Sequence, residues 1–511
     1  MNRINILEYL EETAREVPEK IAFSTGTESR TFGEVLEGSR VIGTNLLKSG
    51  YHGEPVVVLM EKHPDTVITF LGAITAGCYY VCLDGSMPLS RMELILSSLR
   101  PRILVTDAKN AKNAEALRVS ALKKGIALTV VSSDAIRAGE EDAPLLMQAR
   151  ERQLDTDPIY VVFTSGSTGV PKGVIACHRS VIDYTENLCL ALGFSRDTVF
   201  GNQSPLFFDA PLKELMPTLK YGATTYFIPK VNFMFPVRLV EYLNTYRINT
   251  VCWVVSALVQ ISQLGALERV KPEYLTTVAF GSEVFPRRQY DLWREALPNA
   301  RFFNLYGPTE ATGMSCYWEA RPLDADEPIP IGRPFRNTGI LLLTDNGREA
   351  EDGEEGEICI RGTCLTMGYF REREKTDAVF TENPLQTAYR ELIYRTGDIG
   401  VRNEHGELVF RSRKDYQIKL MGRRIELGEI EAVAADCDGV GRACCTFDET
   451  KQRITLFYVG TIDEPGVTAY LKTRLPSYMI PYKMLRIDAM PHTPNGKFDR
   501  RAMKERAEKL S

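Results

Sequence analysis

The sequence has few of the residues on which metal centres, disulfide frameworks and histidine-based triads depend. It contains five histidines and 11 cysteines in 511 residues. No two cysteines have CxxC spacing, and Cys444 and Cys445 are adjacent. This pattern excludes a zinc framework and a disulfide-rich secreted fold, and so few histidines indicate no Ser–His–Asp triad. The composition predicts a cytoplasmic protein with reduced thiols.

The sequence also lacks a basic excess. Lys and Arg number 62 and Asp and Glu number 67, which gives a formal net charge of −5. Proteins that bind nucleic acid mainly by neutralising phosphates carry an excess of positive charge. The charge balance therefore argues against nucleic acid as a partner.

No long hydrophobic run indicates a leader or a membrane span. The first 20 residues carry five acidic side chains and no unbroken apolar core, unlike a signal peptide. The longest uncharged stretch, residues 66–83, is interrupted by Gly72 and Gly77 and ends near a Tyr79-Tyr80 pair. We expect it to form a buried helix that runs into a strand.

What the sequence does contain is an alternation of strand-like and helical patterns. Thr31 and Glu34 have the spacing of a capping box, and apolar residues on helical spacing follow. Strand-like runs stand at 56–60, 79–83 and 103–106, and again at 276–280 and 301–306. This alternation predicts parallel βαβ units. From about residue 340 the spacing shortens, and segments such as 356–361 predict a β-rich subdomain.

A change in composition near residues 411–415 predicts a domain boundary. Length alone predicts three to four domains of about 150 residues. The charged segment 411–415, however, is followed by one small α+β pattern, with strands expected at 418–420, 453–459 and 483–487 and helices at 427–433 and 467–475. We therefore expect an α/β fold with two domains. The first, residues 1–411, has two βαβ-type sheets and a β-rich, barrel-like subdomain, and the second, residues 412–511, is small and mobile.

A loop rich in glycine and hydroxyl residues follows the strand-like run 160–163. It reads TSGSTGVPKG and includes Thr164, Ser165, Gly166, Ser167, Thr168, Gly169 and Lys172. Glycines let backbone N–H groups approach an anion, hydroxyls donate hydrogen bonds and the lysine adds charge. It is not a Walker A loop, because Pro171 stands where that motif has the glycine before its lysine. The pattern favours a polyphosphate-binding loop over a solvated turn.

Five segments, in order along nearly the whole chain, resemble the motifs of the adenylate-forming enzymes. This superfamily comprises acyl-CoA synthetases, luciferases and nonribosomal-peptide adenylation domains. The motifs are the loop 164–173, NLYGPTE at 304–310, YRTGD at 394–398, RKDYQIK at 413–419 and NGKFDR at 495–500. The resemblance implies a two-step reaction. A carboxylate attacks the α-phosphate of ATP to give acyl-AMP and pyrophosphate, and a thiol then takes the acyl group.

The resemblance implies an ATP and magnesium site around the second motif. Glu310 would bind Mg²⁺, which prefers oxygen ligands. Thr309 and Thr164 would contact phosphate oxygens, with the rest of the loop holding ATP. Asn304 and Tyr306 would contact the adenine. No general base is needed, because a carboxylate is already a nucleophile at neutral pH and the task is positioning and charge neutralisation.

Asp398 and Arg413 match the positions that contact the ribose. The chain departs twice from the usual pattern here. Ser412 replaces a common glycine, and Phe410 stands where related domains often carry tyrosine. The missing hydroxyl of Phe410 removes one candidate ribose hydrogen bond.

The C-terminal motif contains the implied catalytic lysine, Lys497, which would bridge the substrate carboxylate, the α-phosphate and the ribose oxygen. Lys497 belongs to the small domain and the phosphate loop to the large one, so chemistry requires the domains to close. Asp415 matches the position at which family members hinge between adenylation and thiol transfer.

The pair Phe208-Asp209 resembles the FD pair whose aspartate binds the α-ammonium group in amino-acid-activating members. The same resemblance implies a side-chain pocket. Its residues are Ala210, Lys213, Trp253, Val278, Phe280, Leu305, Gly313 and Met314. Trp253 and Phe280 are bulky, and Lys213 either pairs with an acidic side chain or points to solvent beside Glu214. We expect a small or short acidic amino acid.

The chain is similar to stand-alone amino-acid adenylation domains and to D-alanine–carrier protein ligases. The latter resemblance includes residues 280–286, although those ligases typically have a cysteine, linked to D-selectivity, where this chain has Gly281. The chain stops 14 residues after Lys497, so we expect a phosphopantetheinylated carrier protein that acts in trans. An acyl- or aryl-CoA synthetase using free coenzyme A stays open, and Asp209 is the discriminating residue. A non-catalytic nucleotide-binding regulatory protein and, on fold analogy alone, a luciferase-like oxygenase are further alternatives.

Overall fold

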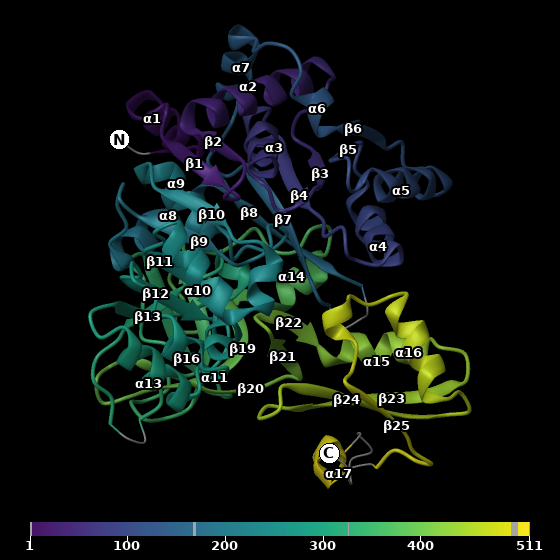
Figure 1. Ribbon diagram of the computed structural model, residues 1–511. Helices are drawn as coiled ribbons and strands as arrows, with labels where there is room; N and C mark the ends of the chain where they lie inside the picture. Colours follow the sequence, from purple (N-terminus) through teal and green to yellow (C-terminus); the bar gives the residue numbers. More distant parts are fainter. Residues whose placement is uncertain (1–2, 167–169, 325–326, 492–498, 510–511) are drawn as a thin grey trace.

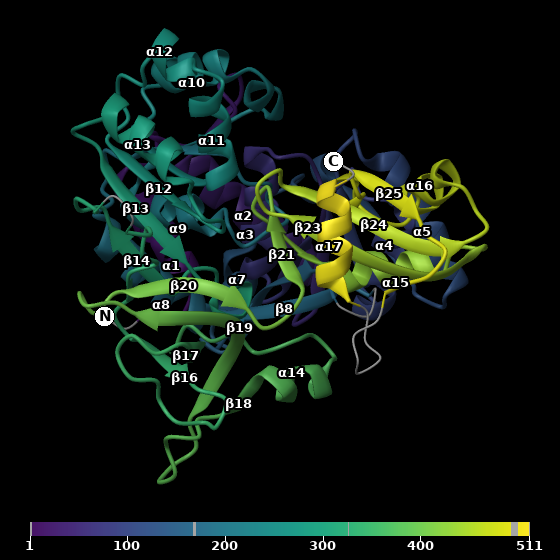
Figure 2. The ribbon, with the colours of Figure 1, turned by 90° about the horizontal axis from the view of Figure 1, so that it is seen from below.

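The computed structural model describes residues 3–166, 170–324, 327–491 and 499–509 (Figure 1). The large domain fills most of the molecule, and the yellow C-terminal domain lies against one side of it (Figures 1 and 2). This mixed α/β architecture, with a large N-terminal and a small C-terminal domain, confirms the predicted fold class.

The first sheet has six strands and contains the predicted phosphate loop. Its strands, in spatial order, are β6 (Thr129–Ser132), β5 (Ile103–Thr106), β3 (Pro55–Leu59), β4 (Tyr79–Cys82), β7 (Pro158–Thr164) and β8 (Lys172–Cys177). All pairs are parallel except β7 with β8, which is antiparallel. The loop therefore leads into a strand, not a helix.

The second sheet has nine strands, parallel in its centre and antiparallel at both edges. In spatial order they are β15 (Arg333–Pro334), β14 (Cys316–Glu319), β13 (Arg301–Tyr306), β12 (Thr277–Gly281), β11 (Thr250–Val254), β9 (Val199–Asn202), β10 (Thr224–Phe227), β1 (Ile21–Ser24) and β2 (Ser29–Thr31). Strands β1 and β2 come from the start of the chain, and β1 pairs with β10, about 200 residues later.

The large domain has the following helices, most of which cover these two sheets or pack between them. In chain order they are α1 (Leu7–Glu16), α2 (Phe32–Lys48), α3 (Pro64–Thr75), α4 (Leu89–Leu99), α5 (Ala111–Lys123), α6 (Ser133–Ile136), α7 (Ala143–Arg150), α8 (His178–Leu192), α9 (Leu212–Tyr221), η1 (Lys230–Met234), α10 (Pro236–Thr245), α11 (Val255–Gln263), α12 (Ala266–Arg269), α13 (Arg287–Ala296), η2 (Thr309–Ala311) and α14 (Arg373–Val379). The predicted capping box starts α2, where Thr31 and Glu34 exchange side-chain and backbone hydrogen bonds.

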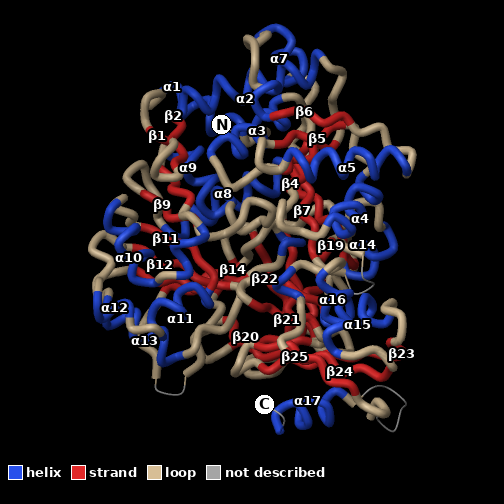
Figure 3. Tube along the Cα trace, turned by 45° about the vertical axis from the view of Figure 1, so that its right-hand side comes forward, coloured by secondary structure: helices blue, strands red, loops and turns tan. Residues whose placement is uncertain are grey.

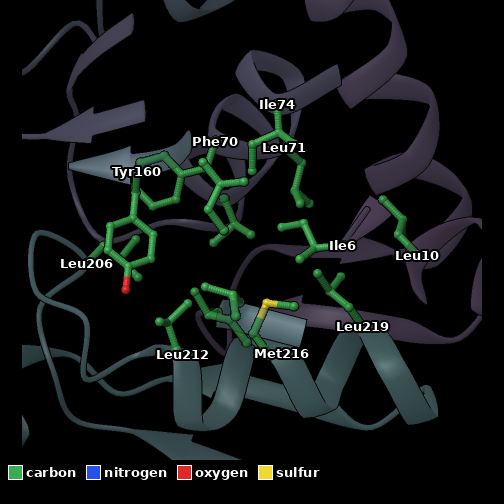
Figure 4. Packing of buried hydrophobic residues seen from close by; sticks show 14 of the residues in the cluster. Ile6, Leu10, Phe70, Leu71, Ile74, Tyr160, Leu206, Leu212, Met216 and Leu219 are labelled. Carbon is green, nitrogen blue, oxygen red and sulfur yellow. The ribbon is translucent and has the colours of Figure 1, made fainter. Parts of the chain in front are cut away.

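The main core joins the helices of the two sheets. In Figure 4, Phe70, Leu71 and Ile74 of α3 face Leu212 and Met216 of α9 across a layer of apolar side chains. Helix α3 and strand β4 together form the buried helix and strand expected for residues 66–83. Among the described residues, no helix has both the length and the apolar character needed to cross a membrane.

The predicted β-rich subdomain is an antiparallel five-stranded sheet. It consists of β16 (Thr338–Leu343), β17 (Gly356–Gly362), β19 (Leu392–Arg402), β18 (Phe380–Glu382) and β20 (Leu408–Arg413). Strand β20 continues into the charged segment that the sequence predicts as linker, since Ser412 and Arg413 pair with Ile399 and Asp398. Backbone pairing here needs no apolar side chains, which explains why the composition hid the strand.

The small domain combines a two-stranded ribbon, a three-stranded sheet and helices. Its elements are β21 (Gln417–Leu420), β22 (Arg423–Glu426), α15 (Leu427–Ala435), β23 (Val440–Asp448), β24 (Arg453–Gly460), α16 (Glu464–Lys472), η3 (Ser477–Met479), β25 (Lys483–Arg486) and α17 (Arg500–Lys509). The ribbon β21–β22 lies between the large domain and the three-stranded sheet (Figures 1 and 3). The boundary at 411/412 and the hinge at Asp415 stay predictions.

Candidate active site

The phosphate loop is held at both ends by the hairpin β7–β8. Thr164 and Lys172 are cross-strand neighbours. A Cβ atom on Gly166 would stand 2.3 Å from the carbonyl oxygen of Val170, so only glycine fits there. Ser167, Thr168 and Gly169 lie outside the described residues. The described ends of the loop fit a close backbone cradle for an anion.

The small domain contacts this loop directly. The Ser165 hydroxyl donates to the carbonyl oxygen of Arg424 at 2.7 Å, and the Gly166 N–H donates to Oε2 of Glu429 at 3.2 Å. Glu429 also forms a buried ion pair with Arg91 of α4. A carboxylate thus accepts the hydrogen bond that an anionic ligand of the loop would use.

Glu310 is the centre of a buried charged cluster. Its side chain is fully buried, and Oε1 accepts from the Tyr369 hydroxyl at 2.7 Å. Arg424 Nη1 donates to both carboxylate oxygens, and Lys172 Nζ lies 3.7 Å from Oε1. Burial favours the neutral acid, but the charges of Arg424 and Lys172 lower the pKa of Glu310 to about 2. Glu310 is therefore a carboxylate at neutral pH.

Asp398 joins the second and third predicted motifs. Its Oδ2 accepts from the Tyr306 hydroxyl at 2.5 Å, and its Oδ1 accepts from Arg413. Arg413 also binds both oxygens of Asp415, at 2.7 and 2.8 Å. The structure thus brings these four predicted residues together. Asn304 lies on the same strand as Tyr306, and its amide donates to the carbonyl oxygen of Pro330 at 2.8 Å.

Asp209 lies near the second motif, just before helix α9. It forms a hydrogen bond with Thr309, and Lys213 and Glu310 are close enough to affect its charge. Burial raises the pKa of Asp209, while the Thr309 hydrogen bond and Lys213 oppose that rise. A Cβ on Gly313 would stand 3.7 Å from Asp209 Oδ2. Asp209, Lys213 and Gly313 therefore belong to one site.

Lys213 is buried, with 6% of its surface exposed. The expectation that it might point to solvent is therefore wrong, because α9 packs this face of the helix into the core. Lys213 forms no ion pair within 4.0 Å with any carboxylate in the described part of the chain. Asp209 and Glu214 are close enough to Lys213 for its charge to oppose the rise of their pKa values. Lys213 thus lies near Asp209 and Glu214 without a direct ion pair to either of them.

The expected side-chain pocket is divided by the nine-stranded sheet. Leu305 and Met314 belong to the core cluster that also contains Cys252 and Ala279. Trp253, Val278 and Phe280 belong to the cluster on the other face, under α10, α11 and α13. Side chains alternate along a strand, so a shift of one residue changes the face. The residues of β11 and β12 that share a face with Leu305 include Cys252, Ala279 and Gly281, the register partner of Leu305.

A network of polar side chains contacts the first turn of α9. Lys62 Nζ donates to Asn202 Oδ1 at 3.2 Å, and Asn202 Nδ2 donates to Glu214 Oε2 at 3.3 Å. Burial lowers the pKa of Lys62 to about 7 and raises that of Glu214 to about 8. The other carboxylate oxygen of Glu214 is buried and has no hydrogen-bond partner among the described residues.

The catalytic lysine implied by the C-terminal motif, Lys497, lies outside the described residues. Its role stays a prediction. Ala210 lies at the turn before α9, where its carbonyl oxygen accepts from the Lys213 N–H at 3.3 Å.

Comparison with known proteins assigns the family. The model of a family described as AMP-binding enzyme matches residues 10–370. The chain is 33% identical over 505 residues to an L-proline–[L-prolyl-carrier protein] ligase of Streptomyces coelicolor, and the match covers 94% of this chain and 92% of that one. The chain belongs to the AMP-binding enzyme family.

Other relatives of this AMP-binding enzyme agree with that assignment. It is 29% identical to a D-alanine–D-alanyl carrier protein ligase of Bacillus licheniformis, over 98% of this chain and 99% of the relative. It also matches longer synthetases, of which it spans less than half. The adenylation domain AlmE of Vibrio cholerae, solved with glycyl-adenosine-5′-phosphate, shares the fold with a TM-score of 0.85 at 19% identity, covering 100% of this chain and 98% of that one.

The donor set of this AMP-binding enzyme fits a magnesium ion brought by a nucleotide. No group of three or more His, Cys, Asp or Glu side chains among the described residues could hold a metal alone. Mg²⁺ usually takes one or two carboxylates and completes its shell with phosphate oxygens and water. Glu310, ionised beside the Gly166 cradle, fits that pattern.

Sequence reasoning missed several residues of this site. Tyr369, Arg424 and Glu429 contact the predicted residues from segments far away in the chain. Lys419 belongs to the fourth motif and lies near Asp398 and Glu283, and burial lowers its pKa. Motif resemblance marks Lys419, but no sequence signal marks the other three.

Proposed function

We propose that this AMP-binding enzyme activates an amino acid with ATP and Mg²⁺ as aminoacyl-AMP and then transfers it to the phosphopantetheine thiol of a separate carrier protein. The observation that carries the proposal is the placement of Asp209. Its carboxylate lies beside Thr309 and Glu310 and can pair with a substrate α-ammonium group. The relatives that match over most of their length, the prolyl and D-alanyl carrier protein ligases, support the same reading.

In the first half-reaction an oxygen of the substrate carboxylate attacks the α-phosphorus of ATP. The new O–P bond forms, the bond to the β-phosphate oxygen breaks, and pyrophosphate leaves with that electron pair. Thr164, Ser165, the Gly166 N–H and Lys172 bind the leaving phosphates, together with the predicted residues Ser167, Thr168 and Gly169. Glu310 would hold the Mg²⁺ ion, which would supply neutralisation of phosphate charge.

The remaining groups orient the nucleotide and the substrate. Asp398, held by Tyr306 and Arg413, offers acceptor oxygens to the ribose hydroxyls, and Asn304 and Tyr306 lie on β13 at the expected adenine site. Lys497 bridges the reacting groups once the small domain has moved. In the second half-reaction the carrier thiol attacks the acyl carbon, its proton passes to solvent and AMP leaves.

In this structure, residues of the small domain occupy groups of the large domain that the polyphosphate and its cation would use. Glu429 accepts the Gly166 N–H, and Arg424 takes both oxygens of Glu310. Adenylation therefore requires these contacts to open. Asp415, held by Arg413 between β20 and β21, is the proposed hinge for that movement.

The proposed substrate is a small or short acidic amino acid. The Lys213 side chain makes no direct ion pair among the described residues, and a side-chain carboxylate of the substrate would supply one. Ala279, a small residue, lies on the same face of the sheet as Leu305. A charge-assisted hydrogen bond to Lys213 would favour an acidic over an apolar substrate.

A pyrophosphate-release assay over all amino acids, both stereoisomers and a set of fatty and aryl acids tests this function. We expect release with an acidic amino acid and its loss in Asp209→Asn. Intact mass of holo-carrier proteins and of free coenzyme A after the reaction then identifies the acceptor. Release only with fatty or aryl acids would favour a CoA synthetase, and no ATP–pyrophosphate exchange with any acid would favour a non-catalytic nucleotide-binding protein.

A further inference from the structure

Tyr369 reaches the candidate active site from a segment that runs beside strand β8. Met367 N–H donates to Ile175 O at 2.9 Å, Ile175 N–H donates to Gly368 O at 3.1 Å, and Phe370 N–H donates to Gly173 O at 2.7 Å. The segment thus extends the hairpin that carries the phosphate loop. Its backbone places the Tyr369 phenol next to Lys172.

The phenol joins the lysine of the loop to the candidate metal ligand. Lys172 Nζ lies 3.1 Å from the Tyr369 hydroxyl, which lies 2.7 Å from Glu310 Oε1. An ammonium group only donates, so the hydroxyl oxygen accepts from Lys172 and its proton points to the carboxylate. Lys172 Nζ also stands 4.6 Å from the centre of the Tyr369 ring. The direction of both hydrogen bonds is therefore fixed.

The two oxygens of Glu310 differ in what holds them. Oε1 is bound by Tyr369, which belongs to the large domain, and by Arg424 at 2.9 Å. Oε2 is bound by Arg424 at 3.1 Å, and Arg424 belongs to the small domain. Movement of the small domain frees Oε2 but leaves Tyr369 on Oε1. Thr366 binds the Glu310 backbone carbonyl, which does not orient the carboxylate.

We propose that Tyr369 is a positioning residue for the metal site. It fixes the Glu310 carboxylate through Oε1 so that Oε2 faces a divalent cation brought with the nucleotide. The proposal rests on the proposed function, in which Glu310 binds that cation. A hydrogen-bonding neighbour that orients a ligating carboxylate strengthens metal binding, and its loss typically weakens affinity about 10- to 100-fold.

The hydroxyl can be removed without disturbing the packing of the ring. The Tyr369 and Phe380 rings meet edge to face at 6.3 Å, and phenylalanine retains that contact. Tyr458→Phe is a matched control, because its hydroxyl donates to the Ile462 carbonyl at 3.1 Å inside the small domain. Tyr369→Phe loses the hydroxyl that accepts from Lys172 and donates to Glu310, whereas Tyr458→Phe loses a hydroxyl that does not touch Glu310.

The test measures Mn²⁺ binding to the enzyme with a non-hydrolysable ATP analogue by electron paramagnetic resonance. We expect Tyr369→Phe to bind Mn²⁺ about 10-fold more weakly than the parent, and Tyr458→Phe to bind it like the parent. The Mg²⁺ concentration for half-maximal pyrophosphate release should rise in parallel. Transfer from preformed aminoacyl-AMP, which involves no polyphosphate, should not change.

The outcomes separate this inference from the proposed function. Equal Mn²⁺ affinity in Tyr369→Phe and the parent overturns the positioning role, even if the enzyme is an active ligase. Equal weakening in both variants also overturns it, because it points to a general loss of stability. A parent that binds no Mn²⁺ with the nucleotide overturns the metal site, and with it the role of Glu310 in the proposed function.

Discussion

Arg424 donates from Nη1 to both oxygens of Glu310, at 2.9 and 3.1 Å, although 114 residues separate the two in the chain. Glu310 belongs to the large domain and Arg424 to the ribbon of the small one. The contact holds the small domain over the phosphate loop. It also occupies the carboxylate that the proposed chemistry needs for its cation.

Replacing this arginine should loosen the small domain. Loss of one partner of a buried ion pair costs about 3–5 kcal/mol. The Arg91–Glu429 pair also joins the two domains and would still hold them together. We expect trypsin to cleave Arg424→Met at the connector 413–416 roughly tenfold faster than the parent. Arg423→Met is the control, because Arg423 stacks on Tyr478 within the small domain, 4.3 Å from its ring centre. Equal cleavage of both variants would contradict the clamp.

Lys213 should decide the choice of substrate. If its ammonium binds a substrate carboxylate, Lys213→Met should lower kcat/KM for the acidic amino acid about 100-fold, since a buried charge-assisted hydrogen bond contributes up to about 3 kcal/mol. Activity with a small neutral amino acid should change little. Lys220→Met, on the same helix and paired with Glu186 at 2.6 Å, is the control. An unchanged ratio of the two kcat/KM values would refute the assignment.

Glu214 should make stability depend on pH. Burial raises its pKa from 4.5 to about 8, so the folded protein keeps a proton that the unfolded chain loses. Its contribution to stability is therefore complete below pH 4.5 and lost as the pH rises through 8. Between pH 5 and 9 the melting temperature of the parent should fall relative to Glu214→Gln.

The matched variant for this measurement is Glu19→Gln, at an exposed position. Lys62 and Lys213 are present in all three proteins, so the difference between the curves reports on Glu214 together with its charge coupling to Lys62. A constant difference from pH 5 to 9 would show that the carboxyl titrates in the folded protein as it does in the unfolded chain.

Lys497 should be needed for adenylation. Removing one preorganised donor to the transition state lowers the rate about 10²- to 10³-fold. We expect that loss in ATP–pyrophosphate exchange by Lys497→Ala, with an unchanged melting temperature, and no loss in Lys504→Ala. Normal exchange in Lys497→Ala would falsify its assignment as the catalytic lysine.

Asp415→Pro should affect one half-reaction more than the other, because proline fixes φ at the proposed hinge. Pyrophosphate exchange reports on adenylation, and carrier loading from preformed aminoacyl-AMP reports on transfer. Asp415→Ala controls for loss of the carboxylate that binds Arg413. Equal effects of proline on both half-reactions argue against a hinge at this position.

Local signals predicted the elements that depend on neighbouring residues. The capping box of Thr31 and Glu34 starts α2, and the apolar runs at 103–106 and 301–306 coincide with β5 and β13. Helix α16 begins at Glu464, earlier than predicted, because Asp463 caps it and Pro465 fits its first turn. The predicted start of this helix was placed from its apolar residues alone.

Relations between distant segments were not predictable from one sequence. Tyr369 lies 197 residues from Lys172, and neither residue type indicates the other. The predicted lining of the side-chain pocket differs from the structure for another reason. Motif resemblance located β12 but did not show which of its side chains point to the substrate side of the sheet. A shift of one residue exchanges the two faces, and the predicted Val278 and Phe280 lie on the opposite face from Ala279.

The pairing of β1 with β10 constrains how the molecule is made. Phe23 and Ser24 need Thr225 and Tyr226 as strand partners. At about 5–20 residues per second, a ribosome needs roughly 10–40 s to synthesise the intervening 200 residues. During that time the edge formed by β1 and β2 has no neighbour in its own sheet. The first helices cannot form their final core until α9 has been synthesised, because the two pack together. Their apolar faces stay exposed until then, so we expect chaperones to bind this N-terminal segment early.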